Sequence, residues 1–188
     1  AVAVVGGILA VLIEGNPDLA LLAAFPVGLL ALAAYGADVV HLYRARKRRI
    51  IELNSRMAAF ALASLGASAV LVAVLLGLGR LTENVGAVVF LTAFGWLSGL
   101  GLSQLYKIVP FLTWLERFGP RMGKGPVPRV QDLVDEGRAA PWFVLYFLAV
   151  LGAAVAIALA APMAAQAAVA AQFVATGLIA SELWRARR

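Results

Sequence analysis

The chain has 188 residues, of which 63% are hydrophobic and only 14% are charged, and its formal net charge is +6. Its mean hydropathy is +0.91. Soluble domains are only about half apolar, so this composition excludes a chain that folds in water alone. The absence of cysteine excludes disulfides, thiolate chemistry and cysteine-ligated metals.

Long apolar segments recur along the chain. A membrane-spanning helix needs about 20 mostly apolar residues, and backbone groups in lipid must find their hydrogen-bond partners within the segment. We therefore predict an all-α fold, a polytopic integral membrane helix bundle that forms one transmembrane domain over residues 1–188. Its six transmembrane helices lie at residues 1–13, which is short, and at 19–42, 57–79, 85–115, 141–161 and 164–183.

The basic residues fall on one side of this predicted bundle. If the six segments alternate across the bilayer, stretches 44–56, 116–138 and 185–188 share a side and carry 14 of the 16 Lys and Arg residues. The positive-inside rule then places these stretches, and the C-terminus, in the cytoplasm. We predict a multi-pass protein of the bacterial cytoplasmic (inner) membrane. Its partners would be the bilayer and its anionic lipid headgroups, and not nucleic acid.

The first apolar segment opens directly at Ala1, without a charged flank. Thirteen residues of helix cover only about 20 Å, and the basic region that precedes a signal-peptide core is absent. We expect upstream sequence to be missing here, so that the native chain is longer.

The fourth segment carries small residues at a helical spacing. Gly95, Gly99, Ser103 and Lys107 follow one another at i+4 and share a face, which lets another helix approach closely. Two readings of Lys107 remain open. It marks the cytoplasmic edge of the membrane, where its stem reaches toward headgroups, or it is a functional charge that pairs with an acid on a neighbouring helix.

The same segment ends in polar and aromatic residues. Gln104 and Tyr106 stand beside Lys107, and Pro110 removes a backbone donor and favours a kink. Aromatic residues then follow at spacings of three and four, at Phe111, Trp114 and Phe118. This pattern predicts an amphipathic turn that lies in the membrane interface.

One acid, Asp38, lies within the second segment at a depth similar to that of Lys107. A pair between Asp38 and Lys107 is one hypothesis. The other is a local contact between Asp38 and His41, three residues further along the same helix face.

His41 is the only histidine, and metal or haem sites usually need several donors. We therefore expect no metal site and no cofactor in this chain alone, and we read His41 as an interfacial aromatic residue. No catalytic constellation is recognisable, so the chain is not expected to be an enzyme on its own.

The sequence FGWLSGLGLSQLYKIVPFLTWLERFGPRMGKGPVP, from residue 94 to 128, resembles the C-terminal half of bacterial membrane proteins related to subunit I of haem–copper oxidases. The earlier ADVVHLYRARKRR resembles the end of a preceding helix in that family. The matched positions are Gly95, Trp96, Tyr106, Lys107, Pro110 and Trp114. The resemblance implies a chain of about twelve helices whose histidines lie mostly in the half that is absent here, so that haem would belong to a missing half or to a partner.

We expect the chain to be an integral membrane subunit or domain of a haem–copper oxidase-like redox protein, non-catalytic in this part. Its partner would be a membrane redox protein or the second half of the same protein. Two alternatives stay open: a small-solute or ion transporter or channel, and a structural or assembly membrane subunit.

Overall fold

The computed structural model describes residues 17–46, 51–123 and 125–187. The chain divides into two compact units, Ala1–Ile50 and Ile51–Arg188, called unit 1 and unit 2 below. The first predicted span, residues 1–13, lies outside the described residues.

The described part of unit 1 contains one helix, α2, from Pro17 to Arg44. It covers the predicted span 19–42. His41 and Arg44 occupy its last turn, where a basic side chain interacts favourably with the helix dipole and its free carbonyl groups.

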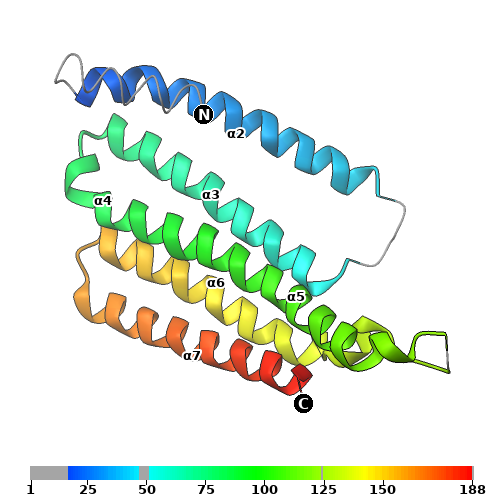
Figure 1. Ribbon diagram of the computed structural model, residues 1–188. Helices are drawn as coiled ribbons and strands as arrows, with labels where there is room; N and C mark the ends of the chain where they lie inside the picture. The colour runs from blue at the N-terminus through cyan, green and yellow to red at the C-terminus, as the bar shows by residue number, and fades with distance from the viewer. Residues whose placement is uncertain (1–16, 47–50, 124, 188) are drawn as a thin grey trace. The chain divides into compact units, whose positions relative to one another are not determined.

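Unit 2 is built from long helices that run side by side (Figure 1). They are α3 (Leu53–Gly77), a continuous helical run composed of α4 (Leu81–Phe90), η1 (Leu91–Ser98) and α5 (Gly99–Phe118), then α6 (Glu136–Ala158) and α7 (Pro162–Arg187). Two short 3-10 turns, η2 (Gly119–Arg121) and η3 (Val130–Leu133), lie in the connection between α5 and α6. No strand occurs in the described ranges of either unit.

The prediction of an all-α fold is confirmed for the described residues. Within the described residues, five helices are long and apolar enough to cross a membrane. The run from Leu81 to Arg121 is 41 residues long, which exceeds the roughly 20 residues that one span needs.

Helix α6 lies at the centre of unit 2 and contacts α3, α4, η1 and α7. Its buried face combines aromatic residues with alanines. Phe143 and Tyr146 are among the largest fully buried side chains, while Ala139, Ala153 and Ala154 are small and buried. Small side chains let helix backbones approach closely where lipid supplies no hydrophobic driving force.

The middle of the fourth predicted span is a π-helix rather than an α-helix. Its eight residues, η1, bring Gly95 against α3, where an added Cβ would stand 2.8 Å from Ser64 Cβ. At the start of α5, Gly99 faces α6, and a Cβ there would stand 2.8 Å from the Phe147 ring. The helical run therefore touches two neighbours through glycines.

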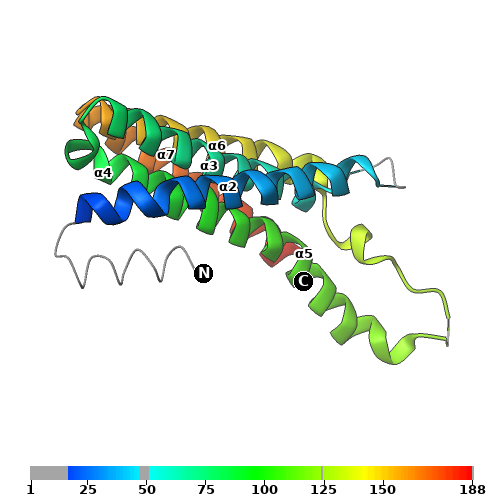
Figure 2. The ribbon, with the colours of Figure 1, turned by 90° about the horizontal axis from the view of Figure 1, so that it is seen from above.

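Pro110 lies inside α5 and is fully buried, and the helix continues past it to Phe118. Figure 2 shows the C-terminal half of α5 leaving the other helices of unit 2, with the connection to α6 running back toward them. Trp114 Nε1 donates to the Pro128 carbonyl at 2.6 Å, which ties the outgoing helix to the returning segment.

Candidate binding pocket at the start of α3

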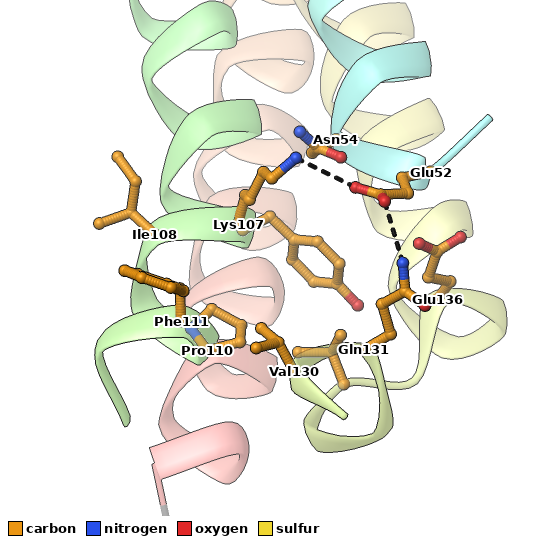
Figure 3. Close-up of a pocket in the computed structure, with 11 residues that line it drawn as sticks. Glu52, Asn54, Lys107, Ile108, Pro110, Phe111, Val130, Gln131 and Glu136 are labelled. Atoms are coloured by element: carbon orange, nitrogen blue, oxygen red, sulfur yellow. Dashed lines mark hydrogen bonds and ion pairs between the residues drawn. The ribbon is translucent and has the colours of Figure 1, made fainter. Parts of the chain in front are cut away.

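Glu52, the N-cap residue of α3, is the centre of a polar cluster at one end of unit 2 (Figure 3). Its Oε2 pairs with Lys107 Nζ of α5 at 3.2 Å, and its Oε1 accepts a hydrogen bond from Gln131 Nε2 of η3 at 2.9 Å. One carboxylate thus joins three segments that are far apart in the sequence.

Glu136 makes a second link at the same end. It lies in the first turn of α6, and its Oε1 accepts from the backbone N–H of Leu53 at 3.0 Å. Its Oε2 lies 3.8 Å from Arg56. The first N–H groups of a helix lack partners within the helix and favour negative charge. The Glu136 carboxylate therefore stabilises the start of α3 from α6.

Tyr106 connects α5 to the start of α6. Its side chain is buried, its hydroxyl donates to the Asp135 carbonyl at 3.1 Å, and its ring meets Phe143 edge-on with centroids 5.6 Å apart. Asp135 is itself the N-cap of α6, since its side chain accepts from the Arg138 N–H at 3.1 Å. Tyr106 thus contacts the N-cap of α6 with its hydroxyl and the buried face of α6 with its ring.

These residues surround a cavity of about 480 Å³. That size lies within the range of about 300–1,000 Å³ that small-molecule sites occupy. One wall is polar and the other apolar; the lining residues are Glu52, Asn54, Tyr106, Lys107, Gln131 and Glu136, with Ile108, Pro110, Phe111, Val130 and Val134. Lys107 and the two carboxylates are already engaged with protein groups. The charged side chains at the cavity are therefore paired with one another or with backbone groups, and they lie beside an apolar wall.

The structure brings three of the predicted site residues, Tyr106, Lys107 and Pro110, to this cavity. Gln104 is exposed on α5. Ser103 is buried, and its hydroxyl donates to the Gly99 carbonyl at 2.7 Å, while Gly95 and Gly99 lie at the helix contacts described above.

Asp38 and His41 both lie on α2 in unit 1. Lys107 pairs with Glu52, an acid that the sequence analysis had not considered as its partner. The pair between Asp38 and Lys107, which would join the two units, and the contact between Asp38 and His41 stay predictions.

Sequence reasoning also missed Gln131 and Glu136. A signal for Glu136 exists, because an acidic pair, Asp135 and Glu136, stands shortly before the predicted span 141–161, and such residues mark helix starts. Within the described residues, no group of three His, Asp or Glu side chains is placed to hold a metal ion.

Comparison of the chain with family models, with curated proteins and with solved structures gave no match.

Proposed function

We propose that this chain is the non-catalytic membrane part of a haem–copper oxidase-like redox protein in the bacterial cytoplasmic membrane. It would cross the bilayer six times and have a cytoplasmic C-terminus. The proposal is supported by what the motif residues of the segment 94–128 do in the structure. Gly95, Tyr106, Pro110 and Trp114 are used for packing or for hydrogen bonds that hold α5 in place.

This arrangement favours a supporting role over a catalytic one. Three residues of the motif link the α4–α5 run to its neighbours: Gly95 to α3, Tyr106 to the start of α6 and Trp114 to the connection after α5. A redox cofactor would accordingly be held by another part of the protein or by a partner subunit, and this bundle would position that part in the membrane.

The charge distribution of unit 2 supports the proposed orientation. Its basic residues in the described ranges, except Arg80, lie at the end where α3 and α6 begin and where α5 and α7 finish. The positive-inside rule assigns such an end to the cytoplasm.

The orientation is directly testable because the chain has no cysteine. Single cysteines at Met122, which is 60% exposed, and at the exposed Thr82 would stand at opposite ends of unit 2. A membrane-impermeant maleimide added to intact cells should label T82C at once and M122C only after lysis. The reverse pattern would refute the orientation.

The functional proposal is tested by purifying the full-length protein from its native membranes. A reduced-minus-oxidised absorption spectrum and the intact mass would be measured together. A Soret band that co-purifies with a chain much longer than 188 residues, or with a distinct haem-bearing subunit, is the expected result. A full-length chain of this size without chromophore or redox partner would refute the proposal and leave transport or structural support.

A further inference from the structure

A second cavity lies midway along the helices of unit 2, between the η1–α5 run, α6 and α7. Its volume is about 460 Å³. Its walls are mostly apolar and include Phe90, Phe94, Leu102, Leu105, Val169 and Phe173. Phe173 is 81% exposed and Val169 is 42% exposed on the outside of α7. The cavity therefore has its rim on the side surface of unit 2, where a membrane-spanning bundle meets lipid.

One buried polar atom of this cavity, the Gln172 side-chain oxygen, has no donor in the described part of the chain, although the amide group also interacts with the Tyr146 hydroxyl. Gln172 lies near the middle of α7, its side chain is only 7% exposed, and its Oε1 finds no hydrogen-bond donor among the described residues. A buried amide oxygen without a donor is destabilising, because it has lost water and gained nothing in exchange. Native structures contain few such groups.

The hydroxyl groups around the cavity already donate elsewhere. Tyr146 donates to the Phe94 carbonyl at 2.7 Å, Ser98 to the Ala93 carbonyl at 2.9 Å, and Thr176 to the Gln172 backbone carbonyl at 2.9 Å. Each hydroxyl oxygen therefore keeps only acceptor capacity. A molecule that satisfies Gln172 Oε1 must therefore bring its own donor, because none of these three hydroxyls has a second hydrogen to give.

We propose that this cavity binds a lipid-soluble alcohol or phenol that enters from the bilayer. Its hydroxyl would donate to Gln172 Oε1 and its apolar body would lie against Phe94 and Phe173. A cavity of this volume fits a small molecule of that kind. Away from its first turn, a spanning helix bonds its backbone N–H groups internally, so a neighbouring helix has no free backbone donor at the depth of Gln172. The proposal does not rest on the oxidase-like function.

The chemistry can be tested with the wild-type full-length chain in lipid nanodiscs. Two photoreactive probes would be compared, octanol with a diazirine on its chain and the methyl ether of the same alcohol, which accepts hydrogen bonds but donates none. After illumination, labelled peptides are mapped by mass spectrometry. We expect the alcohol to label peptides around Gln172 and Ser98 about three- to tenfold more than the ether, the factor that one hydrogen bond supplies. Equal labelling, or no labelling of these peptides, overturns the proposal.

Variants of the chain test whether Gln172 causes the preference for the alcohol over the ether. Q172L should abolish the difference between the two probes. The matched control is Q166L, which changes an exposed glutamine on the same helix outside the cavity and should retain the preference. A preference that survives in folded Q172L overturns the assignment to this residue.

A third variant covers the case in which Q172L fails to fold. Gly101 lines the cavity, and a Cβ added there meets no atom within 4 Å. We expect the leucine of G101L to take up part of the open volume while Gln172 stays intact. Both probes should lose labelling at the cavity peptides in G101L. Unchanged labelling in a folded G101L protein overturns the site.

Discussion

Replacing Gly95 with alanine tests the contact between η1 and α3. The added Cβ would stand 2.8 Å from Ser64 Cβ, and 3.1 Å from both Ser64 Oγ and Leu91 Cδ1. The first of these distances is shorter than any ordinary carbon–carbon contact, which is about 3.5–4.0 Å. Ser64 Cβ is bonded directly to the backbone, so it moves away only if α3 moves with it.

Two opposing terms set the size of the effect. Alanine is a better helix former than glycine by about 0.5–1 kcal/mol. Forcing an extra carbon into a well-packed contact costs about 1–3 kcal/mol. The contact should dominate, so we expect G95A to lower the free energy of unfolding by about 1–2 kcal/mol. In G177A the second term is absent, because a Cβ at Gly177 of α7 meets no atom within 4 Å. We expect that variant to be as stable as the wild type or up to about 1 kcal/mol more stable.

The assay is reversible unfolding in mixed detergent micelles, with helix content followed by circular dichroism. The double variant S64G/G95A removes the atom that the new methyl group would meet, so the two substitutions should be strongly non-additive. If G95A were stabilised to the same degree as G177A, or if its effect simply added to that of S64G, the close approach of η1 to α3 would be refuted.

Substitutions at three polar links of unit 2, measured in the same assay, should rank these links by their contribution to stability. The side chains of the Lys107–Glu52 ion pair are 58% and 28% exposed. A double-mutant cycle of K107M and E52Q should therefore give a coupling energy below about 1 kcal/mol that shrinks with added salt. E182Q should cost more, about 1.5–3 kcal/mol, because that carboxylate is 9% exposed and pairs with two arginines at 3.2 and 2.6 Å. Y146F removes a hydroxyl that donates to an η1 carbonyl at 2.7 Å and should cost about 0.5–1.5 kcal/mol. A larger loss for K107M than for E182Q would contradict this ranking.

Hydropathy predicted the helices of the described residues well, and the deviations have a common cause. The predicted span 141–161 corresponds to α6, which begins five residues earlier at Glu136. Hydropathy detects the part of a helix that dissolves in lipid. The helix itself starts where Asp135 caps its first turn, in a polar stretch that a transfer scale assigns to the loop. Helix α3 likewise begins before residue 57, at Leu53, directly after Glu52.

The cavity at the start of α3 was only partly predictable. Tyr106 and Lys107 stood out because polar residues are rare in the fourth segment, but their partners did not. Lys107 meets Glu52 across 55 residues of chain. Membrane depth restricts which residues lie at the same height, yet it leaves the direction around each helix undetermined. The small-residue spacing had the same limit, since it indicated a packing face but not that Gly95 would meet α3 while Gly99 would meet α6.

The π-helical segment was not predicted, and its surroundings suggest why it persists. π-Helical geometry is rare and occurs mostly as single-turn bulges inside α-helices, frequently at functional sites. On two sides η1 is held by close contacts, since Gly95 meets Ser64 of α3 and the Phe94 carbonyl accepts from Tyr146 of α6. On the side of α7 it borders the cavity that contains the unpartnered Gln172 oxygen. If packing alone had shaped η1, its α7 side should also be filled by side chains. The open volume there, together with the Gln172 oxygen that has no donor among the described residues, favours a site that receives a ligand.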